Sequence, residues 1–249
     1  MIDIYKDFAY LYDRLIGDID YSKWADRIED IFKQNNLKPS LVLDLGCGTG
    51  SFCIEMAKRN YDMIGIDISS DMLSCAKTKS QNLGLDNILY LNQSMSDFEL
   101  YGTVDAIVCL LDSVNYLTSK NDLKKMFKLV KNYLNPGGLF IFDINSEKKL
   151  SSTFGNNLFY EVSDDMTCLW QNRYDSKKKI CEFDITMFVN EDGKYARYDE
   201  IQYERAYSIK EITDAIKNTG LSFIGKYENI KVNKVDKNKD RIFFVCGKR

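Results

Sequence analysis

The stretch "LVLDLGCGTG", residues 41–50, places three glycines within five positions directly after a short apolar run. That run, residues 41–45, has the length and composition of a buried strand in a parallel sheet. The glycines Gly46, Gly48 and Gly50 would let a ligand approach the main chain closely at the carboxyl end of the strand. This edge is where open parallel sheets bind cofactors, so the stretch predicts an α/β fold with a ligand site in its first loop.

Residues 41–144 continue the pattern that the first strand begins. Short apolar runs alternate with segments of helical period, and further strands are expected at four places: 63–67, 87–91, 104–111 and 139–144. Such alternation is typical of parallel strands joined by crossover helices. The sequence "NPGG", residues 135–138, is expected to turn the chain into the fifth strand.

After residue 145 the period changes to two. Residues 181–189 alternate apolar and polar side chains, and Asp192-Gly193 predicts a hairpin into the next strand. A helix that starts with the capping box of Ser208 and Glu211 should stop at Gly220, before two last strands at 221–227 and 241–247. We therefore divide the chain into an N-terminal lid segment and cofactor-binding core (1–149), an antiparallel β insertion that caps the substrate (150–205), and the C-terminal part of the core (206–249).

Composition limits the chemistry and the partners. The 249 residues carry 34 Lys and Arg against 37 Asp and Glu, interspersed along the chain, which argues against nucleic acid or an anionic membrane as the main partner. The chain has no histidine, so Ser-His-Asp hydrolysis and His-ligated zinc are excluded within it, and no metal site is expected. Seven scattered cysteines and a start without a targeting segment predict a cytoplasmic protein with reduced thiols.

The ligand of the first loop is expected to be a nucleoside. A P-loop would need Gly-Lys-Ser/Thr, whereas Gly50 is followed by Ser51 and Phe52. The glycine spacing also departs from the G-x-G-x-x-G of dinucleotide folds. This difference makes a nicotinamide cofactor a weaker hypothesis but does not exclude it. Asp67, at the end of the second strand, stands where an acidic side chain can accept hydrogen bonds from a ribose diol.

Together these motifs resemble those of class I S-adenosylmethionine-dependent methyltransferases. "VLDLGCGTG" is similar to their first motif, "GIDIS" to the acidic second motif, "NQSMSDF" to the adenine-flanking segment and "LNPGGLFIFD" to the entry of the fifth strand. "CLLDSVNYL", the N-terminal "FAYLYDRL" and the insertion are similar to a small-molecule subgroup that includes sugar N,N-dimethyltransferases. The resemblance implies a Rossmann-like, doubly wound seven-stranded sheet whose last strand is antiparallel.

The resemblance also implies contacts to S-adenosylmethionine at matching positions of this chain. Gly46, Cys47 and Gly48 would run along the methionine part of the cofactor, with Asp44 and Gly46 near its amino group. Asp67 would hold the ribose hydroxyls.

The remaining cofactor contacts surround the adenine and the methyl group. Ile68 would cover the adenine, and Ser94 and Met95 match the adenine-edge motif, in which family members commonly have Asp at the position of Ser94. Cys109 and Leu110, which leave the fourth strand, would border the transferable methyl.

The N-terminal aromatic residues complete the expected cofactor site. In related enzymes this segment folds over the cofactor, which would bring Tyr12, Tyr21 and Trp24 towards the sulfonium, whose charge favours aromatic faces. Packing within an N-terminal helical segment is the alternative for these three side chains.

The catalytic and substrate residues follow from what methyl transfer requires. The enzyme's main task is to hold the acceptor atom in line behind an activated methyl, which needs little acid-base equipment. Asp112 and Tyr116, just past the fourth strand, are the candidates to accept a proton from the acceptor or to orient it. Asn115, Trp170 and Arg173 are candidate substrate contacts, and each has an ordinary structural alternative in a turn or on the sheet surface.

The sequence thus favours methyl transfer to a nitrogen or oxygen of a small metabolite. Two alternatives stay open at this point: a nicotinamide-dependent oxidoreductase, favoured by the strand-glycine-acid arrangement, and a nucleoside-binding protein without turnover. Nucleic-acid methylation is disfavoured, because "LLDSVNY" stands where base-amine methylases place an Asn/Asp-Pro-Pro-aromatic motif.

Overall fold

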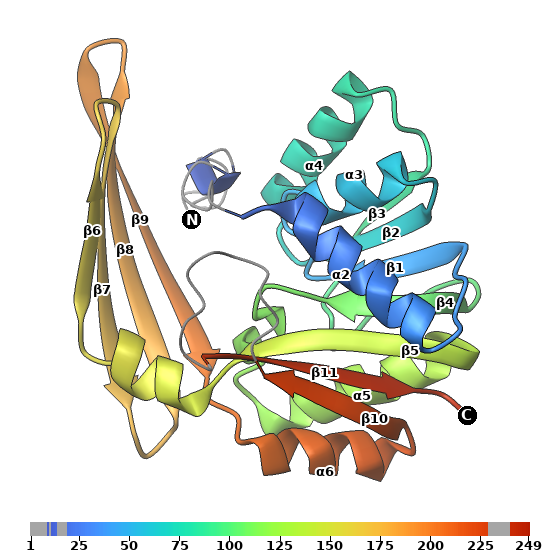
Figure 1. The fold of residues 1–249 in the computed structure, drawn as a ribbon. Coiled ribbons are helices and arrows are strands. Elements are labelled where there is room, and N and C mark those ends of the chain that lie inside the picture. The colour runs from blue at the N-terminus through green and yellow to red at the C-terminus, as the bar shows by residue number, and fades with distance from the viewer. Residues whose placement is uncertain (1–8, 10, 14–18, 229–239) are drawn as a thin grey trace.

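The computed structural model of the protein describes residues 9, 11–13, 19–228 and 240–249. Two sheets lie beside each other: a seven-stranded sheet with helices on both faces, and a four-stranded antiparallel sheet (Figure 1). The order of the larger sheet is β10-β11-β5-β4-β1-β2-β3. Its strands are β1 (Leu41–Leu45), β2 (Asp62–Asp67), β3 (Ile88–Asn92), β4 (Val104–Cys109), β5 (Leu134–Asn145), β10 (Ser222–Glu228) and β11 (Arg241–Gly247).

The strands β1 to β5 are parallel, and β11 runs antiparallel to its neighbours β5 and β10. The predicted fold class, a doubly wound seven-stranded sheet with an antiparallel last strand, is confirmed. The reversed direction of β11 has a local consequence: its first residue lies at the same edge as the carboxyl ends of the parallel strands, since Arg241 pairs with Asn145.

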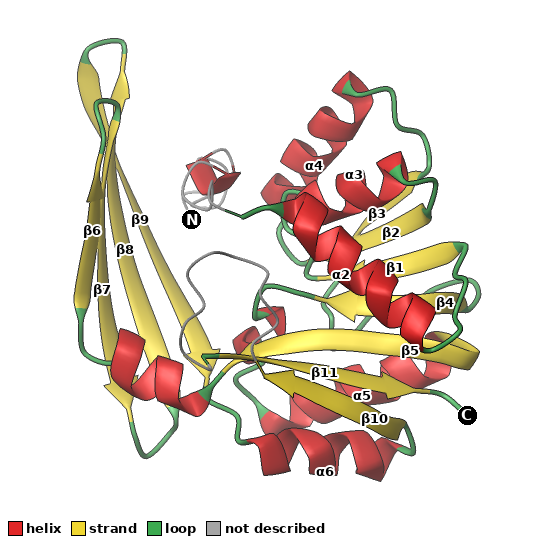
Figure 2. Ribbon diagram, in the orientation of Figure 1, coloured by secondary structure: helices red, strands yellow, loops and turns green. Residues whose placement is uncertain are grey.

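Helices cover both faces of the larger sheet (Figure 2). The apolar sides of α2 (Tyr21–Gln34) and α3 (Ser51–Lys58) share one buried cluster with the sheet, and those of α5 (Lys120–Tyr133) and α6 (Ile209–Thr219) share another. The helix α4 (Ser70–Asn82) packs on β2 and β3. Within the described ranges, no helix is long and apolar enough to cross a membrane.

The helix ends follow the predicted signals. Ser69 caps α4 by accepting a hydrogen bond from the backbone N–H of Met72 at 3.2 Å. The capping box of Ser208 and Glu211 opens α6, and Gly220 ends it in the left-handed conformation.

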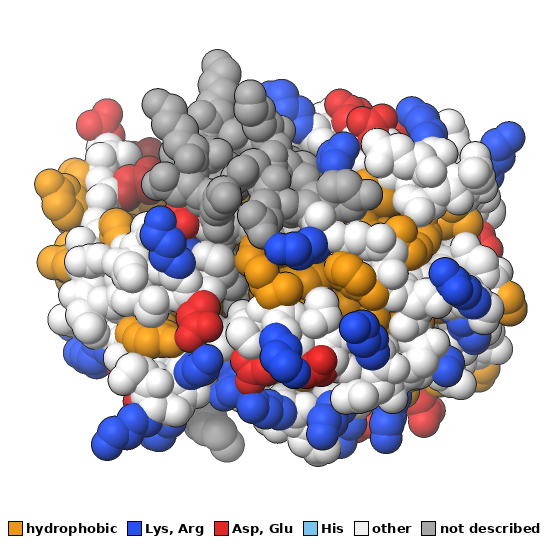
Figure 3. Space-filling view, turned by 60° about the horizontal axis from the view of Figure 1, so that its bottom comes forward, with side chains coloured by type: hydrophobic (Ala, Val, Ile, Leu, Met, Phe, Trp, Pro, Cys, Tyr) orange, Lys and Arg blue, Asp and Glu red, His pale blue; other side chains and the backbone are white. Residues whose placement is uncertain are grey.

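Figure 3, which brings the lower side of Figure 1 forward, shows Lys and Arg side chains scattered over that face rather than gathered in one patch.

The antiparallel insertion is also confirmed. Its strands follow a short helical turn at Lys149–Phe154, and they pair in the order β6-β7-β8-β9. The strands β8 and β9 are joined by the predicted turn, in which Asp192 and Gly193 both have positive φ. The four strands are β6 (Leu158–Val162), β7 (Met166–Asp175), β8 (Ile180–Glu191) and β9 (Lys194–Arg205).

Two expected strand limits were wrong. The strand β5 begins at Leu134, before "NPGG", because Leu134 already pairs with Val104 and an irregular register with a left-handed Gly137 lets pairing continue through the turn sequence. The strand β4 ends at Cys109, so Leu110 and Leu111 belong to the loop that leaves the sheet.

Candidate active site

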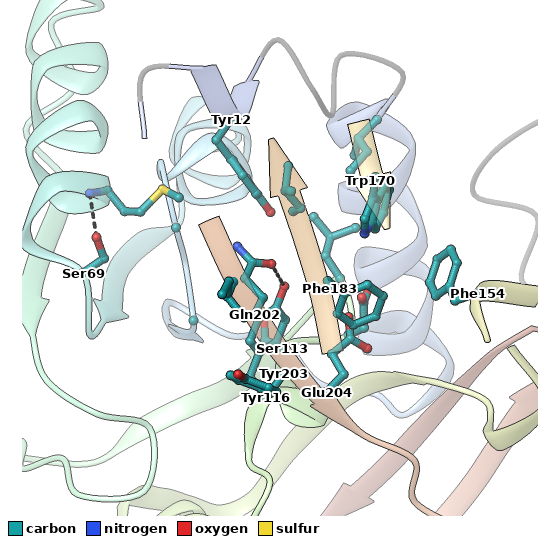
Figure 4. Close-up of a pocket in the computed structure, with 18 of the residues that line it drawn as sticks. Tyr12, Ser69, Ser113, Tyr116, Phe154, Trp170, Phe183, Gln202, Tyr203 and Glu204 are labelled. Carbon is teal, nitrogen blue, oxygen red and sulfur yellow. Dashed lines mark hydrogen bonds between the residues drawn. The ribbon is translucent and has the colours of Figure 1, made fainter. Parts of the chain in front are cut away.

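A cavity of about 820 Å³ lies between the carboxyl edge of the larger sheet and the insertion (Figure 4). Both halves of the molecule contribute side chains to its wall. The residues that line it include Tyr12, Gly46, Gly48, Asp67, Ile68, Met95, Asp112, Tyr116, Lys149, Phe154, Trp170, Phe183, Gln202, Glu204 and Arg241.

The three glycines of the first loop have three different surroundings. A Cβ at Gly48 would meet no atom within 4 Å, so this backbone faces open space at the cavity wall. A Cβ at Gly46 would come within 3.0 Å of the Ser113 side chain, and one at Gly50 within 2.6 Å of the Tyr90 hydroxyl. Since all three have positive φ, glycine is favoured throughout, but only Gly48 leaves room for a ligand.

Asp67 holds the ends of β1 and β2 together at the predicted ribose site. Its Oδ2 accepts the backbone N–H of Gly48 at 2.8 Å and its Oδ1 accepts that of Ser69 at 2.9 Å. A carboxylate has about four lone-pair positions, so two further hydrogen bonds can be accepted from the cavity. Next to it Ile68 exposes 74% of its surface, which leaves an apolar side chain free to cover a flat ligand.

The predicted adenine-edge residues separate in the structure. Met95 lines the cavity, whereas Ser94 does not, and its hydroxyl shares a 3.1 Å hydrogen bond with the hydroxyl of Ser96.

Behind the glycine loop lies a buried group of acid and thiols. Asp44 is 3% exposed and accepts a hydrogen bond from the Cys53 thiol at 3.4 Å. Burial raises the pKa of Asp44 to about 7. Neither Asp44 nor Cys47 is among the residues that line the cavity, and the same holds for the buried Cys109 and Leu110.

The loop after β4 is held in an unusual conformation at the cavity wall. Leu111 and Asp112 have consecutive positive φ values of 56° and 58°, a conformation that costs a residue with a side chain roughly 1–2 kcal/mol. Their backbone N–H groups donate to the two carboxylate oxygens of Asp143, at 2.8 and 3.0 Å. The fully buried Asp143 of β5 thereby fixes this loop.

Arg241, the first residue of β11, pairs with both acids at this place. Its guanidinium lies 2.7 Å from the Oδ1 of Asp112 and also pairs with Asp143. Burial alone would raise the pKa of Asp112, but the charges of Arg241 and Lys149 hold it below its usual range. Asp112 is therefore an ionised carboxylate in an ion pair. It is a weak proton acceptor, and its side chain is held in place by Arg241.

The N-terminal aromatic residues take different positions. Tyr12 lines the cavity, and its hydroxyl points inward (Figure 4). Tyr21 is partly buried and packs with the core cluster under α2 and α3, outside the cavity lining. Trp24 is 2% exposed, and its ring packs against Phe243 at 5.3 Å and under the guanidinium of Arg241 at 5.7 Å. Of the three, only Tyr12 reaches the cavity.

A polar contact ties the N-terminal segment to the first loop. Asp13 accepts a hydrogen bond from the Thr49 hydroxyl at 2.5 Å and forms an ion pair with Lys79 at 2.6 Å. The residue that follows Tyr12 is thus anchored beside Gly48.

The turn after β4 places Tyr116 and Asn115 on opposite sides. Tyr116 lines the cavity and donates a 2.8 Å hydrogen bond to Gln202 of β9. Asn115 is fully buried, and its side-chain amide donates to the backbone carbonyls of Asn145 and Arg205. These contacts give Asn115 a structural position between the two sheets, away from the cavity lining.

The two candidate substrate residues of β7 also separate. Trp170 lines the cavity, and its indole Nε1 is buried without a hydrogen-bond partner. Arg173 lies outside the lining and forms a 2.8 Å ion pair with Glu182 on the exposed face of the insertion. The alternation of β7 explains this, because residues three apart point to opposite faces of a strand.

Several residues that meet at the cavity were not predicted from the sequence. Arg241 had a readable signal: once the last strand is expected to be antiparallel, its first residue belongs at the edge where the parallel strands end. Glu204 had none, because the two-residue period of β9 does not say which of its faces is buried. Lys149 and Phe154 come from the turn between β5 and β6, whose path the sequence left undefined.

Comparison with known proteins shows the family to which the chain belongs. A family model described as "Methyltransferase domain" matches residues 42–138. The "Putative methyltransferase YqeM" of Bacillus subtilis (strain 168) is 32% identical over 246 residues, which cover 98% of this chain and 97% of that protein. A crystal structure of an S-adenosylmethionine-dependent methyltransferase from Clostridium acetobutylicum is 37% identical, with a TM-score of 0.88 over 98% of both chains. The chain belongs to the class I S-adenosylmethionine-dependent methyltransferases.

More distant relatives share the fold of this methyltransferase. The structure of DesVI from Streptomyces venezuelae has a TM-score of 0.77 at 22% identity, covering 99% of this chain and 98% of that one. A Streptomyces venezuelae dTDP-3-amino-3,4,6-trideoxy-alpha-D-glucopyranose N,N-dimethyltransferase is 29% identical over 124 residues, half of each chain. Among the described residues of this methyltransferase, no three His, Cys, Asp or Glu side chains gather where they could hold a metal ion.

Proposed function

We propose that this methyltransferase transfers a methyl group to a nitrogen or oxygen of a small metabolite in the cytoplasm. The observation that carries the proposal is the extent of the cavity. It runs from Gly48 and Asp67 at the edge of the larger sheet to Trp170 and Glu204 on the insertion. A volume of about 820 Å³ suits a cofactor together with a small acceptor, and pockets for small molecules are typically about 300–1,000 Å³.

The residues at the sheet edge fit S-adenosylmethionine. The open backbone at Gly48, the remaining lone pairs of Asp67 and the exposed Ile68 could take an amino-acid tail, a ribose and an adenine respectively. When bound, S-adenosylmethionine supplies a methyl group that its sulfonium charge has already activated.

The chain's own task is then to bind and orient the acceptor. The proposed acceptor side of the cavity is the part lined by Tyr116, Phe154, Trp170, Phe183 and Glu204. Aromatic rings there offer the acceptor an apolar surface, and the Tyr116 hydroxyl is held by Gln202 through a hydrogen bond. Asp112, paired with Arg241, is proposed to orient the acceptor by its charge.

The test measures cofactor binding and turnover separately. Calorimetry should show that S-adenosylhomocysteine binds, and incubation of the full chain with methyl-labelled S-adenosylmethionine and a fractionated small-molecule extract should label a low-mass product. Binding without label in any small molecule, or label only in nucleic acid or protein, would reject the proposal. Tyr116→Phe should then lower kcat without changing the affinity for S-adenosylhomocysteine.

A further inference from the structure

Glu204, on the acceptor side of the cavity, forms no ion pair with any described residue, although the charges of Lys149 and Arg241 act on its carboxylate from farther away. It lies near the end of β9, is 4% exposed, and lines the cavity close to Phe183 and Tyr116 (Figure 4). Its Oε2 accepts a hydrogen bond from the Asn145 side-chain amide at 2.8 Å. No described residue donates a hydrogen bond to Oε1, and none forms an ion pair with Glu204.

The neighbouring charges show why this carboxylate is available. Asp112 is already paired with Arg241, and Lys149 donates to Asn145 at 2.9 Å while lying 4.9 Å from the centre of the Phe154 ring. Asn145 thus links Lys149, Asp112 and Glu204, and it satisfies one oxygen of each acid. The network leaves one oxygen of Glu204 for a donor that comes from the cavity.

We propose that Glu204 binds the methyl acceptor directly, and that the acceptor is an amine on an apolar body. The proposal rests on the proposed function and decides between its two acceptor atoms. An ammonium group would supply the directly paired cation that Glu204 lacks among the described residues. The body of the molecule would lie against Phe183 and Trp170, whose ring centres are 5.8 Å apart.

The same carboxylate can take the proton that an amine must lose before it attacks. An N–H bond of the ammonium breaks, its electron pair stays on nitrogen, and the proton forms an O–H bond with Oε1. Burial, followed by the charge of Asp112, raises the pKa of Glu204 well above its usual range, which makes its carboxylate a stronger base. The proton returns to water when the product leaves, so the chain is unchanged after the cycle.

An alcohol or a carboxylate acceptor would fit this place less well. An alcohol leaves Glu204 without a directly paired cation, and a carboxylate adds a third negative charge beside those of Glu204 and Asp112. An acceptor of either kind would lose a charge-assisted hydrogen bond in a buried site, and we expect its affinity to be roughly tenfold or more lower than that of an amine.

The experiment compares three probes of one shape: benzylamine, benzyl alcohol and benzoate. Each is titrated by calorimetry or by NMR into the full chain saturated with S-adenosylhomocysteine at pH 7. Benzylamine should bind roughly tenfold or more tightly than the other two. Equal binding, tighter binding of the alcohol or benzoate, or no measurable binding of all three would overturn the inference.

Two variants assign the preference to one residue. Glu204→Gln keeps the shape and should abolish the preference for the amine, with an unchanged affinity for S-adenosylhomocysteine. Glu200→Gln is the matched control, because Glu200 is equally buried on β9 but does not line the cavity, and it should keep the preference. A preference that survives Glu204→Gln contradicts the assignment. Failure of S-adenosylhomocysteine to bind the parent would instead contradict the proposed function.

Discussion

Arg241 pairs with the carboxylates of both Asp112 and Asp143, so the first residue of the last strand fixes the loop that leaves the fourth. This relationship joins β11, β5 and the loop after β4 at the cavity wall. Asp143 in turn accepts the backbone N–H groups of Leu111 and Asp112. The strained loop conformation therefore depends on one buried cluster of two acids and one cation.

Loss of this cation should destabilise the fold. Arg241→Met would leave two buried carboxylates unpaired, which typically costs about 3–5 kcal/mol, measurable as a lower free energy of unfolding in urea at pH 7. Arg173→Ala is the control, because Arg173 forms an exposed pair with Glu182 and its loss should cost at most about 1 kcal/mol. Equal effects of the two substitutions would show that the buried cluster does not hold the loop.

Removal of the proposed ribose acceptor should weaken cofactor binding. We expect Asp67→Ala to reduce the affinity for S-adenosylhomocysteine by roughly tenfold or more in calorimetry, because two hydrogen bonds to a carboxylate are lost. Asp71→Ala, in the first turn of α4 and outside the cavity lining, should leave this affinity unchanged. If Asp67→Ala binds like the parent, the ribose site lies elsewhere.

The glycines of the first loop should separate binding from stability. Gly48→Val would fill open space at the cavity wall, so it should lower the affinity for S-adenosylhomocysteine severely while costing only about 1–2 kcal/mol for its left-handed backbone.

Gly50→Ala provides the contrast. Its Cβ would lie 2.8 Å from the Cβ of Ala76 and closer still to the Tyr90 hydroxyl, so this substitution should lower the unfolding free energy more than Gly48→Val does. Thermal unfolding and calorimetry of both variants check the two expectations. A stable, tightly binding Gly48→Val protein would exclude the cavity wall at this loop as the cofactor site.

Asp44 should make stability depend on pH. Its pKa is about 7 in the folded chain and near 3.8 when exposed, so the folded state binds this proton more tightly. The contribution of Asp44 to the free energy of unfolding is therefore fully present below about pH 4. It is lost as the pH rises through about 7, where the buried acid must ionise. Asp44→Asn should be more stable than the parent at pH 8 by about 1 kcal/mol or more, with a smaller difference at pH 5. Urea unfolding at both pH values measures it, and a difference that does not grow with pH would contradict the burial effect.

The sequence was sufficient to predict the fold and some of the residues that line the cavity. The strand periods, the glycines after β1 and the caps at Ser69, Ser208 and Gly220 are local features, and local features can be read from one chain. The network of Arg241, Asp112 and Glu204 joins segments that are far apart in sequence, so their contact depends on how the insertion lies against the sheet. That placement has no local signal.

The same reason explains the residues that fell outside the cavity. Trp24 and Asn115 have the side chains that binding sites use, but both are buried by packing between elements that the sequence does not place. The end of β2 thus places Asp67 at the cavity, whereas tertiary packing takes Trp24 and Asn115 away from it.

The two walls of the cavity belong to separately hydrogen-bonded sheets, and this has a consequence for protein engineering. Side chains on the inward face of β7, β8 and β9 can be exchanged without disturbing the backbone pairing of β1, β2 and β4, which positions the first loop. Libraries confined to those three strands would vary the insertion side of the cavity and leave the backbone of the first loop unchanged, a favourable starting point for redirecting the enzyme to new substrates.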